Sequence, residues 1–123
     1  MSQEESNVLT EQHMKLNGKL LRDAKRLLDE GDFVQASEKF WGAAAQAIKA
    51  VVAKRRLKIM RHRSISEFVY KLHEEFPEQR FWELYRAASE LHTNFYEEHL
   101  PPNGVVENAK AVEELINKLR VLT

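Results

Sequence analysis

Apolar residues recur along most of the chain at the three- and four-residue spacing that is typical of amphipathic helices. The pattern is strongest between Phe33 and Val52, where two neighbouring apolar stripes cover a wide arc of the expected helix. The stripes consist of Phe33, Ala36, Phe40, Ala43, Ala47 and Val51, and of Trp41, Ala44, Ile48 and Val52. Other helices must cover such a surface on more than one side, so this stretch is predicted to be the central helix of the fold.

Turn-forming and capping residues divide the pattern into five predicted helices. Gly31 suits the left-handed position that ends a helix, and Asp32 can cap the next one, with Gln35 at the reciprocal position of a capping box. Pro77 and the segment 100–104 interrupt the pattern again. The expected helices span residues 10–30, 32–56, 64–76 and 78–99, with a fifth starting at about residue 105, and residues 1–7 are expected to be disordered.

The same pattern predicts the fold class. No segment alternates apolar and polar residues over a useful length, so no β-sheet is expected. Short connections between helices favour antiparallel neighbours. We therefore predict an all-α fold, an up-and-down antiparallel bundle of four to five helices, with residues 1–123 forming a single domain.

The composition argues against several classes of function. Lys plus Arg and Asp plus Glu each total 19, so the net charge is zero and there is no global basic field of the kind found in many nucleic-acid-binding proteins. Cysteine is absent, which removes thiol catalysis and thiolate metal sites. Neither metal-ligand spacing nor a glycine-rich phosphate loop occurs, so no metal or cofactor is expected. Without a membrane-spanning apolar run or a signal peptide, a cytoplasmic location is expected.

Positive charge gathers at the end of the predicted central helix. No acidic residue occurs between Glu38 and Glu67, and the segment 54–63 is rich in Lys and Arg. Such a cluster can hold phosphate groups, but cations also favour the negative end of a helix dipole. The candidate ligand-binding residues here are Arg55, Arg56, Arg61 and Arg63.

A second group of polar side chains lies on the predicted fourth helix. Tyr85, Ser89, His92, Tyr96 and His99 share one stripe. These side chains could bind a phosphate or a base or perform acid–base chemistry, or they could form a seam between helices or subunits. In an up-and-down bundle the second and fourth helices end at the same end. The arginines are therefore expected to lie near His92, Tyr96 and His99, with His13 at that end as well.

The third candidate site is a pair of residues, Arg86 and His92, with five residues between them. Six steps along a straight helix place two side chains about 120° apart, so this pair would not meet within one chain. Arg86 could instead form an ion pair with Glu90, four residues further on.

Two segments resemble a known family. ASEKFWGAAAQAIKA (36–50) and ASELHTNFYEEHL (88–100) are similar to the small archaeal PaREP family, which is related to the HEPN-type (higher eukaryotes and prokaryotes nucleotide-binding) helical domains. The resemblance extends from the first predicted helix to the fifth and implies a HEPN-like up-and-down bundle, often dimeric. Some HEPN domains are RNases that use an Arg, four to six intervening residues and a His, and Arg86 and His92 match that spacing.

Two functions are therefore considered. The first is a non-enzymatic binding module, expected to be a homodimer, that binds a protein or a nucleotide or nucleic-acid partner. Its expected ligand surface combines the basic cluster with the histidines and tyrosine of the fourth helix. The alternative is a metal-independent endoribonuclease with Arg86 and His92 as catalytic residues, paired across a dimer.

Overall fold

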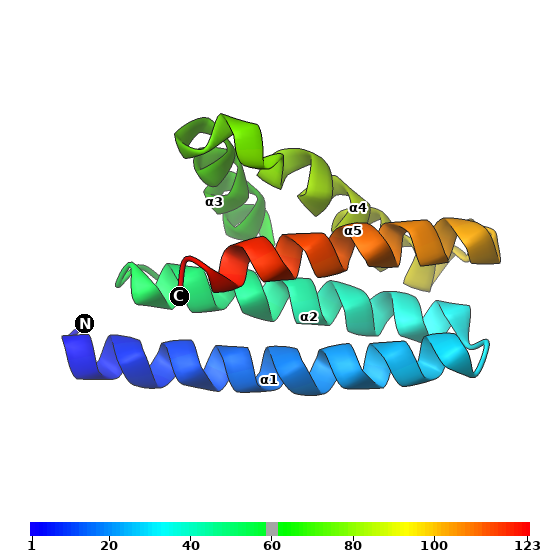
Figure 1. The fold of residues 1–123 in the computed structure, drawn as a ribbon, viewed down its shortest axis with the longest axis horizontal. Coiled ribbons are helices and arrows are strands. Elements are labelled where there is room, and N and C mark those ends of the chain that lie inside the picture. Colours follow the sequence, from blue (N-terminus) through cyan, green and yellow to red (C-terminus); the bar gives the residue numbers. More distant parts are fainter. Residues whose placement is uncertain (59–61) are drawn as a thin grey trace.

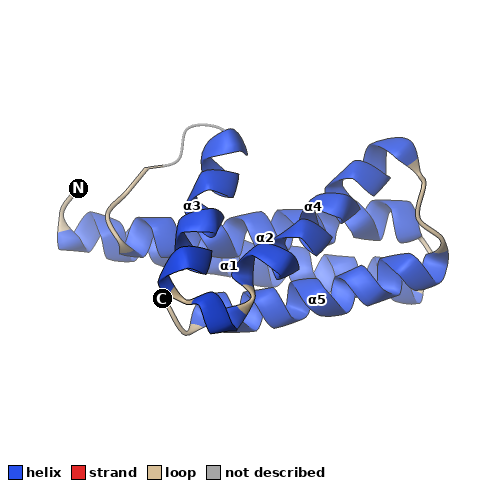
Figure 2. Ribbon diagram, turned by 90° about the horizontal axis from the view of Figure 1, so that it is seen from above, coloured by secondary structure: helices blue, strands red, loops and turns tan. Residues whose placement is uncertain are grey.

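The structure is a computed structural model that describes residues 1–58 and 62–123, apart from the side chains of His62 and Arg63. Its elements are α1 (Gln3–Asp29), α2 (Phe33–Lys54), α3 (His62–Glu75), the short 3-10 helix η1 (Pro77–Gln79), α4 (Phe81–Glu97) and α5 (Pro102–Arg120). No strand occurs in these described ranges, so the prediction of an all-α fold is confirmed (Figure 2). Within the same ranges, no helix is long and apolar enough to cross a membrane.

The helices α1, α2 and α5 lie along the length of the molecule, and α4 runs obliquely to them (Figure 1). In chain order these four helices alternate in direction. The helix α2 lies between α1 and α5 and also contacts α3 and α4. The shorter helix α3 crosses α1 and α2 at a steep angle (Figure 2). The prediction that the stretch after Gly31 forms the central helix is therefore confirmed.

Small side chains on α2 allow its neighbours to approach closely. Ala43, Ala44, Ala47 and Ala50 have no exposed surface, and Phe40 is almost completely buried. Gly42 faces α1, where an added Cβ atom would lie 3.3 Å from a methyl carbon of Leu20. Close packing of this kind keeps the dispersion contacts that a looser interface would lose.

Buried polar side chains set the register between α1 and α2. The Ser6 hydroxyl donates a 2.6 Å hydrogen bond to the backbone oxygen of Ala53, and Asn17 Nδ2 donates a 2.7 Å bond to the backbone oxygen of Ala43. Both polar groups are fully buried, and a shifted register would leave them without these partners.

The turn between α1 and α2 forms as the sequence predicts at Gly31 and Asp32. Gly31 has a φ angle of 80°, and the Asp32 side chain accepts a hydrogen bond from the backbone N–H of Gln35. The reciprocal bond of the capping box is replaced, because the N–H of Asp32 donates to the backbone oxygen of Leu27.

Several helix boundaries differ from the prediction. The helix α1 starts at Gln3 because Ser2 and Glu5 form a capping box, so it includes most of the segment 1–7 that was expected to be disordered. The helix α3 starts two residues before residue 64, the start expected from the sequence. The helix α5 starts at Pro102, since proline fits the first turn of a helix.

The expected directions of α2 and α4 were wrong. Asn94, near the end of α4, donates to the Ser37 hydroxyl near the start of α2, so the two helices run antiparallel (Figure 1). The cause is α3, which has 14 residues and crosses the bundle instead of returning along it. The C-terminal end of α4 therefore lies at the opposite end of the bundle from the C-terminal end of α2.

Candidate functional site

A continuous chain of aromatic rings crosses α3, α4 and α2. Neighbouring ring centroids lie 4.9–6.0 Å apart, which is within the range of favourable aromatic pairs. We call this chain the aromatic ladder, and its members in spatial order are His73, Tyr70, Trp82, Tyr85, Trp41, His92, Tyr96 and Phe95. Its inner rings are part of the core, whereas Tyr70 and Tyr96 are 46% and 70% exposed.

A groove lies at the α3 end of the aromatic ladder. It has a volume of about 380 Å³ and is mainly apolar. We call it the α3–α4 groove, and its lining residues are Ser66, Glu67, Tyr70, Lys71, Glu74 and Trp82. The rings of Tyr70 and Trp82 meet edge to face, with centroids 5.2 Å apart, so the groove offers aromatic surface next to two carboxylates.

Tyr85 supports the groove from beneath. Its side chain is buried, it stacks on Trp82 at 5.7 Å, and its hydroxyl oxygen lies 3.0 Å from the Ser66 hydroxyl oxygen. Burial raises the pKa of Tyr85, and the hydrogen bond with Ser66 partly opposes that rise. Tyr85 is thus a neutral structural residue that holds Trp82 in place and not an exposed member of a polar stripe.

His92 is held by groups from α2. Its Nδ1 atom lies 3.1 Å from a carboxylate oxygen of Glu38, and its ring stacks on Trp41 with the centroids 4.9 Å apart. A carboxylate can only accept, so the Nδ1 atom carries the hydrogen of this bond. The arrangement orients the imidazole and leaves about a quarter of the His92 side chain exposed.

Arg86 and His92 do not form a site within one chain. Arg86 is exposed on α4, and its charge contributes to lowering the pKa of Glu83, after the larger effect of hydrogen bonds from Arg80. The ion pair expected between Arg86 and Glu90 is replaced, because the Glu90 carboxylate lies 3.5 Å from His99 Nε2. His99 itself lies beyond α4, which ends at Glu97, so it no longer follows the helical stripe.

The arginines of the basic cluster have local partners or lie outside the described residues. Arg55 forms two hydrogen bonds with Glu75, of 2.8 and 3.1 Å, and lies over the ring of Phe68. Arg56 donates a hydrogen bond to the side-chain oxygen of Gln3. Arg61 lies outside the described residues, as does the side chain of Arg63.

The structure therefore separates two groups that were expected to meet. His92 and Tyr96 lie near the start of α2, whereas Arg55 and Arg56 follow its last turn. His13 does lie at the basic end, where its Nδ1 atom is 2.7 Å from the side-chain oxygen of Gln46. Periodicity placed His92 and Tyr96 on one face correctly, but it could not show which residues of α2 they would contact.

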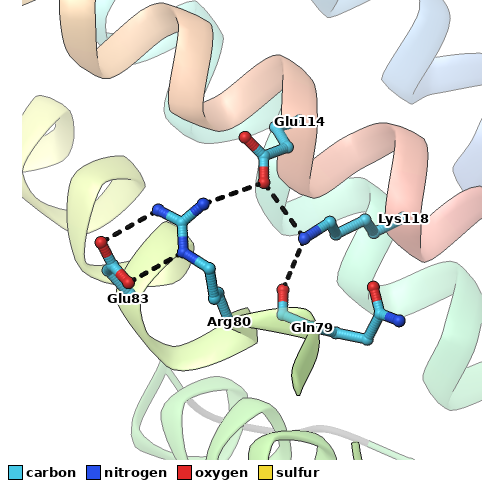
Figure 3. Close-up of polar contacts among 5 residues, drawn as sticks. All are labelled: Gln79, Arg80, Glu83, Glu114 and Lys118. Atoms are coloured by element: carbon cyan, nitrogen blue, oxygen red, sulfur yellow. Dashed lines mark hydrogen bonds and ion pairs between the residues drawn. The ribbon is translucent and has the colours of Figure 1, made fainter. Parts of the chain in front are cut away.

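A polar cluster connects η1, α4 and α5 (Figure 3). Arg80 donates two 3.0 Å hydrogen bonds to Glu83 and lies 3.5 Å from Glu114. Lys118 lies 3.1 Å from the same Glu114 oxygen and donates a 2.7 Å bond to the backbone oxygen of Gln79. The positive and negative charges of these side chains neutralise one another. The cluster therefore joins the three elements.

The sequence analysis did not single out Tyr70, Trp82, Glu38 or Trp41 as site residues. Tyr70 and Trp82 are aromatic residues outside the apolar stripes of α3 and α4, which was a usable local signal for a surface role. Glu38 and Trp41 come next to His92 only through folding. Within the part of the chain that the structure describes, no three His, Asp or Glu side chains gather in a way that could hold a metal ion.

Comparisons with known proteins agree with the resemblance noted in segments 36–50 and 88–100. No curated protein matches the chain. The crystal structure of a protein from Sulfolobus solfataricus is similar, with a TM-score of 0.78 and 25% sequence identity over 87% of this chain and 95% of that chain. The model of the archaeal PaREP1/PaREP8 family matches residues 12–116, which extend from α1 into α5. This chain therefore belongs to the archaeal PaREP1/PaREP8 family.

Proposed function

We propose that the protein is a non-enzymatic binding module, and that a basic segment of a partner protein binds in the α3–α4 groove. The observation that carries the proposal is the pair of exposed Tyr70 and partly buried Trp82 beside the carboxylates of Glu67 and Glu74. A guanidinium or ammonium group over an exposed aromatic ring contributes about 0.5–1 kcal/mol, and a neighbouring carboxylate adds charge-assisted hydrogen bonds.

The charge around the groove supports a basic protein segment over a nucleic acid. Residues 64–79 contain four exposed glutamates and one lysine, and three of these glutamates, Glu67, Glu74 and Glu78, are outside the ion pair between Arg55 and Glu75. A phosphate backbone would meet repulsion on this surface, whereas Lys and Arg side chains would be attracted to it.

The proposal is tested with two labelled peptides of equal length, one with Arg and Lys at several positions and one with Glu at the same positions. We expect the basic peptide to bind, and Tyr70→Ala and Glu74→Gln each to weaken its binding about two- to fivefold. The matched control is Tyr96→Ala, which removes an exposed tyrosine at the other end of the aromatic ladder and is expected to change nothing. Equal binding of both peptides, or unchanged binding by both groove variants, would contradict the proposal.

The alternative function, an endoribonuclease that uses Arg86 and His92, is tested separately. We expect no metal-independent RNA cleavage by the wild-type protein. His92 is hydrogen-bonded to Glu38 and stacked on Trp41, while Arg86 lies on an exposed face. RNA cleavage that His92→Ala abolishes would replace the binding module with a nuclease. Homodimer formation and a cytoplasmic location remain predictions.

A further inference from the structure

A second hollow lies between the first turns of α1 and the last turn of α2. It has a volume of about 310 Å³, at the lower end of the range of small-molecule pockets. We call it the α1–α2 pocket, and its lining residues are Met1, Leu9, His13, Lys49, Val52, Ala53, Leu57 and Lys58. It shares no residue with the α3–α4 groove, so an inference about it does not depend on the proposed function.

The backbone after α2 builds one wall of this pocket. Arg56 adopts a left-handed φ angle of 59°, and the N–H of Leu57 donates to the backbone oxygen of Val52. This turn is the Schellman arrangement, in which the residue after the left-handed position packs back on the helix. It holds Leu57 beside Val52 while leaving half of the Leu57 side chain exposed.

The pocket combines an apolar floor with a cationic rim. Leu9, Val52, Ala53 and Leu57 supply apolar surface, and the two lysines among the lining residues are Lys49 and Lys58. None of the eight lining residues is acidic. The pKa of Glu5, near the start of α1, is lowered mainly by hydrogen bonds with Ser2. The positive charge of Lys58 makes a smaller contribution to this lowering.

His13 also lies at the rim, where its Nδ1 atom contacts a partner within the protein. The side-chain oxygen of Gln46 can only accept, so the 2.7 Å contact places a hydrogen on His13 Nδ1. That bond orients the His13 ring and uses its Nδ1 hydrogen within the protein, so the positive charge of the rim comes from Lys49 and Lys58.

A neighbouring hollow shows why the α1–α2 pocket is the better site for an anion. The two hollows share Val52, Leu57 and Lys58, but the neighbour is also lined by Glu67 and by Arg55, which is paired with Glu75. An anion there would meet Lys58 and Lys71, but also the Glu67 carboxylate, and the charge of Arg55 is already paired with Glu75. An anion in the α1–α2 pocket would meet lysines and no carboxylate among the lining residues.

We propose that the α1–α2 pocket binds a small organic anion with an apolar body and one anionic group. The apolar body would cover Leu9, Val52 and Leu57, and the anionic group would lie between Lys49 and Lys58. A neutral apolar molecule would leave the lysines unused, and inorganic phosphate would leave the apolar floor exposed to water.

The test uses two fluorescent probes that differ in charge, anilinonaphthalene sulfonate and the neutral N-phenyl-naphthylamine. We expect the anionic probe to bind, and Lys49→Gln/Lys58→Gln to weaken its binding about tenfold, while binding of the neutral probe changes less than twofold. Lys58→Gln alone alters only an exposed side chain and is expected to produce about a threefold loss. The matched control is Lys71→Gln, because Lys71 lines the neighbouring hollow but not the α1–α2 pocket.

Three results would overturn the inference. The first is equal affinity of the anionic probe for the wild type and for both lysine variants. The second is a loss of affinity in Lys71→Gln as large as in Lys58→Gln, and the third is an equal loss of affinity for the anionic and the neutral probe in the lysine variants. Thermal unfolding of each variant is measured alongside, because a partly unfolded protein also binds the anionic probe. A loss that accompanies unfolding in Lys49→Gln/Lys58→Gln would leave the decision to Lys58→Gln.

Discussion

At the scale of single residues, the helices α1 and α2 end in the same backbone turn with different residues at its centre. Gly31 and Arg56 occupy the left-handed position, with φ angles of 80° and 59°. In both turns the next residue donates its N–H to a carbonyl five positions earlier. Glycine adopts this conformation without strain, whereas a residue with a Cβ atom is destabilised by about 1 kcal/mol.

We therefore expect Arg56→Gly to raise the free energy of unfolding by about 0.5 kcal/mol. Relief of the left-handed strain would exceed the loss of one exposed hydrogen bond from Arg56 to Gln3. Urea unfolding measures the change, and Lys54→Gly, in the last turn of α2, is the control that should lower the stability. A less stable Arg56→Gly would show that the Gln3 contact outweighs the strain.

At the scale of elements, the short helices α3 and η1 decide how α4 is positioned. A 14-residue helix is about 21 Å long, too short to return along the 22-residue α2. The turn that follows is stabilised at Arg80, where the chain is again left-handed and the guanidinium joins Glu83 of α4 to Glu114 of α5 (Figure 3).

This cluster predicts an acid-dependent loss of stability. Hydrogen bonds from Arg80 lower the pKa of Glu83 below its ordinary value of 4.5. The ionised Glu83 therefore adds stability above about pH 4.5, and this stability is lost as the pH falls through the lowered pKa. We expect thermal stability to decline less between pH 5 and pH 3 in Glu83→Gln than in the wild type. Glu107→Gln, on α5, is the control, and an identical decline in Glu83→Gln and the wild type would argue against the interaction.

At the scale of the whole molecule, Asn94 joins the end of α4 to the start of α2. Its Nδ2 atom donates to the Ser37 hydroxyl, which in turn donates to the backbone oxygen of Phe33. Its Oδ1 atom accepts a 2.8 Å hydrogen bond from the N–H of Leu100. The network closes the loop before α5 and fixes the end of the bundle at which His92 lies.

Asn94→Ala is expected to lower the free energy of unfolding by about 1–3 kcal/mol, because the N–H of Leu100 loses its partner and a buried space opens. Urea unfolding is again the measurement. Thr93→Ala, which removes an exposed hydroxyl one residue earlier, should change the stability by less than about 0.5 kcal/mol. Similar effects of the two substitutions would mean that Asn94 does not join the helices.

Local patterns in the sequence determined the helical class, the central position of α2 and the turn at Gly31 and Asp32. These features depend on periodicity and on the conformational preferences of single residues, which act over a few positions. The same reasoning placed His92 and Tyr96 on one face of α4.

Only the tertiary structure decided the direction of α4, the contact of His92 with Glu38 and the meeting of Tyr70 with Trp82 in the α3–α4 groove. The physical reason is that the crossing angle of α3 depends on how its side chains pack against α2 and α4. Periodicity within one helix carries no information about that angle, so the two candidate groups that the sequence placed together lie at opposite ends of the bundle.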